Sequence, residues 1–344
     1  MLNDDPPGMP GDTDSGVSQH SDLAWLADTL MGAGMIRGRE DLLRGGSRPD
    51  AKTFYLTHRP AAGPSGTEAG QGIVVRFHGG AHATAPEWPG EAAFFESLPR
   101  VDLPVQGETV VFRDRAAARA CTVTPDLRAT HFRAWDSAGD IDAARTALIA
   151  SVARVHGVWW PSRDLRQKAG TAPFGLEALM QRDRRIVARA AAAVARMSHI
   201  RADVLNWMEA TLDAAATSKQ ARLSAGSPLT RVHGSPSLGA LWLPRKTSSV
   251  PVILTDWDDW RIDLWAGDIA RLLLDDTSGR LSLEKVLSVY TDTLAELNID
   301  NHSRAEMLQD IRACMPFEMA VAIVQGRATA SRTAHWRMLI DNFV

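Results

Sequence analysis

The sequence predicts an α+β protein in which a small strand-rich lobe precedes a larger helical lobe. Short runs rich in β-branched and aromatic residues, separated by Gly- and Pro-rich segments, occur between residues 53 and 123. After about residue 139, apolar residues recur at helical spacing instead. Two apolar runs, 240–243 and 250–255, are separated by a polar turn and predict one β-hairpin within the helical lobe.

Composition and charge limit the classes of function. The 344 residues include 45% hydrophobic and 23% charged residues, which is ordinary for one large or two modest globular domains. A net charge of -3 disfavours a nucleic-acid partner. No run approaches the about 18 apolar residues of a membrane span, and no signal peptide is visible. Cys121 and Cys314 form neither a metal-type spacing nor a disulfide framework. We therefore expect a cytoplasmic protein without nucleic-acid or membrane partners.

The first lobe is expected to span residues 21–125. The acidic, Pro- and Gly-rich residues 1–20 are typical of a disordered tail, and Ser21 is expected to cap the first helix. Gly45, Gly46 and Ser47 predict a turn. The predicted strands and one inserted helix then follow in the order strand 53–56, loop 59–72, strand 73–77, helix 89–98, strand 109–112 and strand 120–123.

The second lobe, residues 126–344, is expected to be mainly helical. Ile141, Ala144 and Leu148 begin an apolar series at helical spacing, and Gly157 occupies the position of a C-cap glycine. Further helices are predicted at 176–197, 202–215, 264–274, 281–297 and from Ser303 to the C-terminus. In the first of these, a charged run is expected to form a solvated face: Arg182, Asp183, Arg184, Arg185 and Arg189.

The segment 231–243, RVHGSPSLGALWL, followed by 252–259, VILTDWDD, is the most informative. It resembles the catalytic loop and metal-binding hairpin of the aminoglycoside phosphotransferase and choline kinase-like superfamily. That pattern reads His-Gly-Asp, five residues ending in Asn, an apolar strand, a turn and Ile-Asp-Trp/Phe. Residues 263–273, DLWAGDIARLL, resemble the start of the helix that follows in this superfamily.

Further pieces occur in the order that this superfamily has. The glycine-rich turn and second strand correspond to 45–55, the phosphate-binding Lys strand to 74–76, and the helix Glu to Glu91 in EAAFF. The segment 153–160, ARVHGVWW, resembles the ecdysteroid-kinase-like (CHK kinase-like) branch. The resemblance covers roughly residues 45–297.

The resemblance implies a two-lobed protein-kinase-like fold that uses ATP or GTP with Mg²⁺. The first lobe would bind the nucleotide, and the second would carry the catalytic loop and the acceptor site. Implied roles are metal binding for Asp256, phosphate binding for Arg76 and pairing with that cation for Glu91. His233 belongs to the catalytic loop, and Asp268 would support the loop's backbone. The acceptor would be a small hydroxylated molecule; an apolar acceptor and a protein partner are left open.

The chain departs from the superfamily pattern at its key positions. Ser235 stands at the base Asp, Ala240 at the metal-binding Asn and Arg76 at the Lys. Loss of a general base costs about 10²–10⁴ in rate. The preferred interpretation is a phosphotransferase-family protein that is weakly active or inactive. One alternative is an active small-molecule kinase in which Asp258 or Asp259 is the base, or in which the substrate loses its proton without a base. Another is a non-catalytic ligand-binding or scaffold module. The acidic cluster Asp256, Asp258 and Asp259 could also be only a solvated turn.

Overall fold

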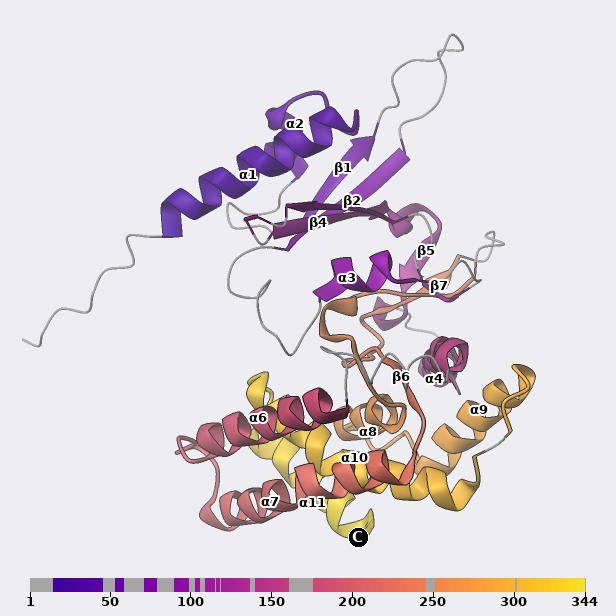
Figure 1. The fold of residues 1–344 in the computed structure, drawn as a ribbon. Helices are drawn as coiled ribbons and strands as arrows, with labels where there is room; N and C mark the ends of the chain where they lie inside the picture. Colours follow the sequence, from indigo (N-terminus) through magenta and orange to yellow (C-terminus); the bar gives the residue numbers. More distant parts are fainter. Residues whose placement is uncertain are drawn as a thin grey trace, which may run out of the picture. The chain divides into compact units, whose positions relative to one another are not determined.

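The computed structural model describes residues 15–45, 53–58, 71–78, 90–98, 103–105, 109–114, 116–117, 119–136, 140–160, 176–245, 251–300 and 302–343. The chain forms two compact units, shown in Figure 1. The first contains Met1–Ala85 and Glu108–Asp126, and the second contains Pro86–Gly107 and Leu127–Val344. Gly46 and Ser47 of the predicted turn lie outside the described residues, as does most of the predicted loop 59–72.

In its described residues, the first unit combines two helices with one four-stranded antiparallel sheet of order β1-β2-β4-β3. Its elements are α1 (Ser15–Gly32), α2 (Arg39–Gly45), β1 (Thr53–His58), β2 (Gln71–His78), β3 (Val110–Asp114) and β4 (Arg119–Pro125). The helix α1 begins at Ser15, six residues before the predicted cap Ser21. The predicted start of the helix was too far along the chain. Residues 15–20 contain no proline, so nothing in them prevents a helix from forming.

Alternation along β1 explains how α1 packs on this sheet. Phe54 and Leu56 are buried, whereas Tyr55 between them is exposed, as the two-residue period of a strand requires. Phe54 and Leu56 share one apolar cluster with Leu26 and Leu30 of α1. The apolar stripe of α1 therefore covers the inward face of the sheet.

The second unit, where the structure describes it, is helical with two small antiparallel sheets. Its helices are α3 (Gly90–Glu96), α4 (Ile141–Trp159), α6 (Leu176–Val194), α7 (Ala202–Ala225), α8 (Ala266–Asp275), α9 (Leu283–Glu296), α10 (Arg304–Val324) and α11 (Ala330–Phe343), with short 3-10 turns η2 (Leu127–Ala129), η3 (Ala134–Asp136) and η4 (Trp257–Asp259). One sheet has the order β5-β7-β8, formed by β5 (His131–Arg133), β7 (Leu241–Pro244) and β8 (Ile253–Leu254); the other pairs β6 (Leu229–Val232) with β9 (Arg261–Leu264).

The predicted hairpin is present as β7 and β8, in which Leu241 pairs with Leu254. Three other strands of this unit, β5, β6 and β9, were not predicted. They have only three or four residues each, which is too short for a two-residue period to be visible.

Three predicted helix ends were wrong. The helix α7 continues to Ala225 and stops at Gly226, which has a left-handed φ of 94°. The C-terminal segment contains two helices rather than one, because Gly326, with φ 71°, turns the chain after α10. Gly157 lies inside α4 and is not its C-cap. A Cβ at Gly157 would come within 2.4 Å of the Cδ1 of Leu297, so this glycine leaves room for a packed neighbour.

Tryptophans form much of the second unit's core. Trp257, Trp265 and Trp336 are fully buried. Each indole N–H has an acceptor: the carbonyl oxygen of Leu254 at 3.0 Å, a carboxylate oxygen of Asp310 at 3.0 Å and the carbonyl oxygen of Leu274 at 3.1 Å. These bonds let the large rings be buried without leaving a polar atom unsatisfied.

Within the part of the chain that the structure describes, every helix is too short or too polar to cross a lipid bilayer.

Candidate catalytic loop

The candidate loop begins directly after β6, where Val232 pairs with Arg261 of β9. Gly234 in this loop has a φ of 83°. A Cβ added to it would lie 2.1 Å from the backbone oxygen of Asp259. Both the left-handed backbone and the close approach to η4 therefore require glycine at this position.

The carboxylate of Asp268, in the first turn of α8, fixes the shape of the loop. Its two oxygens accept hydrogen bonds from the backbone N–H groups of His233 at 2.6 Å and Gly234 at 2.7 Å. Burial by itself would raise the pKa of Asp268, but hydrogen bonds from His156 and His233 outweigh it and lower that pKa. Asp268 is therefore an anion buried against the loop backbone.

A second set of hydrogen bonds orients Asp268. His156 of α4 bonds to it through Nε2 at 3.0 Å, and the hydroxyl of Tyr290 lies 2.7 Å from the Nδ1 of His156. Burial, with the charge of Asp268, raises the pKa of Tyr290. The carboxylate of Asp268 can only accept, so Nε2 of His156 carries a proton, and in that tautomer Nδ1 accepts from the hydroxyl of Tyr290. The series Tyr290, His156 and Asp268 thus joins α9 and α4 to the loop. The sequence analysis gave no role to His156, although its His-Gly-Val-Trp-Trp segment had marked the position.

The side chain of His233 ties the loop to the hairpin. Its Nε2 lies 2.8 Å from the carbonyl oxygen of Thr255, which can only accept, so Nε2 carries the proton. Its Nδ1 then accepts from the N–H of Ser235 at 3.3 Å. The ring is buried and lies 4.5 Å, between centroids, from Trp257. Both nitrogens of His233 are therefore occupied by the loop and the end of the hairpin.

Ser235 and Ala240, the two positions predicted to be degenerate, offer neither a carboxylate nor an amide side chain. Ser235 is half-buried, and its Oγ accepts a hydrogen bond from Arg327 at 2.8 Å. Ala240 is buried; its carbonyl oxygen accepts from the N–H of Thr255 at 2.9 Å and from its hydroxyl at 3.1 Å. A methyl side chain at position 240 cannot ligate a metal.

Asp256 follows β8 and begins η4 in a left-handed conformation with φ 64°, which is rare outside glycine. Its side chain is half-buried. The next residue, Trp257, stacks on Phe94 of α3 with a centroid distance of 3.9 Å and an interplanar angle of 7°. This stack fixes η4 against α3.

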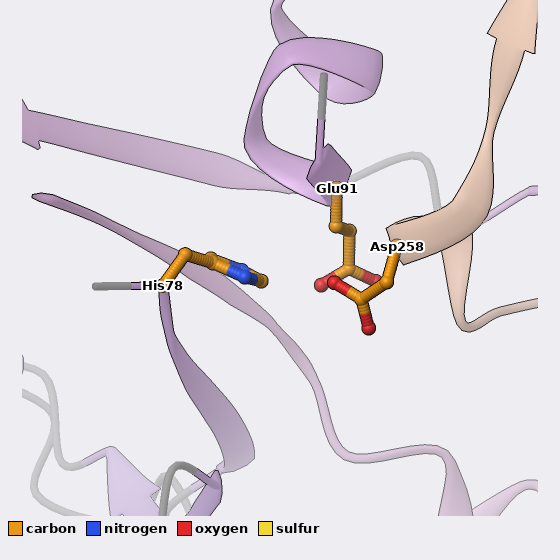
Figure 2. A group of neighbouring side chains, drawn as sticks. All are labelled: His78, Glu91 and Asp258. Carbon is orange, nitrogen blue, oxygen red and sulfur yellow. The ribbon is translucent and has the colours of Figure 1, made fainter. Parts of the chain in front are cut away.

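The same contact brings two carboxylates together. Glu91 lies three residues before Phe94 on α3 and is buried, and its carboxylate lies within 4.8 Å of that of Asp258 in η4. Figure 2 shows Glu91 and Asp258 facing each other; it also draws His78, which lies on β2 of the first unit. Carboxylate oxygens are the donors that Mg²⁺ prefers. The donor set around η4 therefore fits Mg²⁺.

Arg76 lies on β2 of the first unit and is half-buried, opposite Thr122 of β4 and Thr53 of β1. Its pairing with Glu91 stays a prediction, as do the roles assigned to the other site residues.

A buried network of charges lies beneath the loop. Asp263 of β9 receives Lys219 at 2.7 Å, Arg261 at 2.8 Å and Arg182 at 2.9 Å. Burial would raise the pKa of Asp263, but these three cations outweigh it and hold that pKa far below its usual range. Arg182 and its partner Asp183 are buried in this network, so the prediction that both lie on a solvated face was wrong. Their partners come from α7 and β9, which no local sequence pattern could reveal.

The sequence analysis also missed Gln325 and Arg327. Both lie in the turn after α10, and they contact Asp259 at 2.8 Å and Ser235 at 2.8 Å respectively. A glycine after a long apolar run, here Gly326, is the signal for a helix end that could have placed a turn at this position.

Neither a protein-family model nor the sequence of a curated protein matches the chain. Solved structures do. Choline kinase LicA from Streptococcus pneumoniae matches with a TM-score of 0.54 and 10% identity, covering 94% of this chain and 98% of that one. LicA in complex with AMP gives 0.53 and 9%, covering 93% and 98%. The Plasmodium vivax ethanolamine kinase Pv091845 gives 0.51 and 10%, covering 96% and 89%.

At these identities the likeness establishes the fold. The chain has the kinase-like fold of these structures over nearly its whole length, and the predicted fold class is confirmed.

Proposed function

We propose that this protein is related to the ATP-dependent kinases of small hydroxylated molecules and binds nucleotide with Mg²⁺, but transfers phosphoryl groups weakly or not at all. One observation carries the proposal. The carboxylate of Asp268 holds the backbone of His233 and Gly234 in place, while the next residue, Ser235, offers no carboxylate. The support of a catalytic loop is thus retained and its base is missing.

The nucleotide part of the proposal rests on the fold and the acidic turn. One structure with the same fold contains AMP, which favours an adenine nucleotide, with GTP as the other choice. Asp256 would bind Mg²⁺, aided by Glu91 and Asp258, and Arg76 would bind the phosphates. Mg²⁺, when bound, neutralises phosphate charge.

The catalytic part depends on proton transfer. A positioned carboxylate that accepts the acceptor's hydroxyl proton is worth about 10²–10⁴ in rate. A serine hydroxyl is a far weaker base than a carboxylate. In addition, the guanidinium of Arg327 lies 2.8 Å from Ser235 Oγ, and its positive charge makes protonation of this oxygen still less favourable. Ala240 removes a metal ligand as well. We therefore expect little phosphoryl transfer by the wild-type protein.

An active kinase remains the second candidate, with Asp258 or Asp259 of η4 as base, because the backbone of η4 adjoins the loop. The backbone oxygen of Asp259 adjoins Gly234, and its carboxylate accepts from Gln325 at 2.8 Å. If Asp259 is the base, the wild type turns over ATP with a hydroxylated acceptor and Asp259→Asn abolishes the turnover. A purely scaffolding protein would bind no nucleotide at all.

Nucleotide binding is the test. Isothermal titration of the full chain with ATP should give binding that requires Mg²⁺. Asp256→Ala should weaken it at least about tenfold, because even secondary metal contacts are worth that much. The matched control is Asp292→Ala, since Asp292 is an exposed carboxylate of α9, and it should leave the affinity unchanged. Equal binding by Asp256→Ala and the wild type would contradict the metal assignment.

A further inference from the structure

The turn after α10 presents a cation to the candidate loop. Gly326, in its left-handed conformation, donates to the carbonyl oxygen of Ile323 at 2.9 Å, and Arg327 N–H donates to that of Ala322 at 2.9 Å. These bonds close the end of the helix and fix the backbone of Gln325 and Arg327. The side chain of Gln325 contacts Asp259 and that of Arg327 contacts Ser235. The hydrogen-bonded turn therefore positions Arg327 next to the loop.

The guanidinium of Arg327 lies against the side chain of Ser235, the predicted base position. Its NH2 donates to the Oγ of Ser235 at 2.8 Å, and its NH1 lies 3.3 Å from a carboxylate oxygen of Asp275 in α8. Its side chain remains 33% exposed. A guanidinium has five N–H donors in a planar fork, and these two contacts use only part of it. Donors therefore remain for a ligand from solvent.

The charged side chains around Arg327, counted with Arg327 itself, carry more positive than negative charge. From α8 come Arg271 and Asp275, joined at 2.9 Å; from η4 comes Asp259; and from α11 comes Arg332, 4.0 Å from Asp275. Three guanidinium groups thus surround two carboxylates. Gln325 holds Arg271 at 2.8 Å and Asp259 at 2.8 Å, which keeps this arrangement together. Ser235, being neutral, adds no negative charge.

From this arrangement we propose that Ser235 and Arg327 form a binding site for an oxyanion. The site takes a phosphate or carboxylate group through the guanidinium N–H donors and the serine hydroxyl, which are the partners such groups prefer. The assignment of this site to the acceptor side rests on the proposed function, because it takes Ser235 as the base position. The bound molecule is therefore anionic, whereas choline and ethanolamine, the substrates named for the structures of similar fold, are cations that a guanidinium repels.

The test uses the full chain without nucleotide. Heteronuclear NMR titrations with sodium phosphate, sodium malonate and choline chloride at constant ionic strength give the affinity for each charge type. Phosphate or malonate should bind, and the stronger of the two identifies the group. Arg327→Gln should weaken that binding at least about tenfold, because a charge-assisted bond is lost. Arg327→Lys should retain part of it, since the charge is kept without the fork.

Arg337→Gln is the matched control. Arg337 lies on α11, has a similar exposure of 42% and also pairs with a carboxylate, that of Asp203 at 3.3 Å. The Arg337→Gln variant should bind the anion with the affinity of the wild type. Three results would overturn the proposal. Neither anion binds the wild type, Arg327→Gln binds the anion as tightly as the wild type, or choline binds more tightly than both anions.

The outcome is separable from that of the proposed function. Asp256→Ala should bind phosphate or malonate as the wild type does, because it leaves Arg327 unchanged. If ATP fails to bind while the anion still binds through Arg327, the anion site stands and the nucleotide proposal fails. If ATP binds with Mg²⁺ and anion binding does not depend on Arg327, the anion-site proposal fails while the nucleotide proposal stands.

Discussion

At the residue scale, Gly234 is the most constrained position of the candidate loop. Its φ of 83° is left-handed, and a Cβ would collide with the backbone of Asp259 at 2.1 Å. Gly279, between α8 and α9, has a similar φ of 65°, but a Cβ there would meet nothing within 4 Å. Substitution of either glycine by alanine therefore costs free energy for the left-handed backbone, but only at Gly234 does the new Cβ also meet a steric clash.

Gly234→Ala should consequently lower the free energy of unfolding by about 1–3 kcal/mol more than Gly279→Ala does. Gly279→Ala should itself cost about 1–2 kcal/mol for the left-handed backbone. Urea denaturation followed by circular dichroism measures both. Equal losses would show that the loop does not press against η4 as described.

At the element scale, α8 connects the loop to α4 and α9 through one buried carboxylate. Asp268 accepts from His233, Gly234 and His156, so three donors depend on it. Asparagine offers one oxygen, and its amide would face these donors with N–H groups of its own. Asp268→Asn should therefore cost about 3 kcal/mol or more, at about 1.5–3 kcal/mol for each bond to a charged group. The exposed Asp292→Asn serves as the control.

Acidification supplies a second readout of the same contact. The folded pKa of Asp268 lies below its ordinary value of 3.8, so its charge stabilises the folded state fully above that pH. This stabilisation is lost as the pH falls from 3.8 through the lower folded pKa. The stability difference between wild type and Asp268→Asn should then narrow below that pH in denaturation curves. A difference that stays constant from pH 6 downward would mean that Asp268 is not a buried anion in the folded protein.

At the scale of the whole molecule, the buried charge network joins α6, α7, β9 and α10. Lys219 lies 2.7 Å from Asp263 and 3.0 Å from Asp183, with its ammonium 3.5 Å from the ring centroid of Phe317. Removing one partner of a buried pair leaves the other charge uncompensated, which costs about 3–5 kcal/mol. Lys219→Met should therefore lower the free energy of unfolding by that amount.

Lys285→Met provides the comparison in thermal and urea unfolding, because Lys285 is a half-buried residue in the first turn of α9. It should change stability by no more than about 0.5 kcal/mol. Similar effects of the two substitutions would show that the network contributes nothing to stability.

The order of strands and helices could be predicted because the spacing of apolar residues that marks each element lies within a short stretch of sequence. It failed where partners are distant in the chain. Arg182 was expected on a solvated face, but Asp263, which is 81 residues away, pairs with it in the interior. Arg327 was overlooked because it lies 92 residues from Ser235, outside every motif of the loop. The loop motif named His233 and Asp268, which the structure joins by a hydrogen bond, but their catalytic roles stay predictions. The residues that surround Ser235 follow only from the packing of α8, α10 and α11.

The central claim, that the loop keeps its support and lacks its base, can be tested by restoring the base. An aspartate at position 235 alone would pair with Arg327, which lies 2.8 Å from Ser235 Oγ, and this would lower the pKa of the new base. The variant therefore combines Ser235→Asp with Ala240→Asn, which returns a metal ligand, and Arg327→Gln.

The most direct measurement is slow ATP hydrolysis by this triple variant and by the wild type under identical conditions with Mg²⁺. Our account predicts a wild type near background and a clear rise in the variant, toward the about 10²–10⁴ that a general base is worth. A wild type that already hydrolyses or transfers phosphate at ordinary kinase rates, about 1–100 s⁻¹, would contradict it.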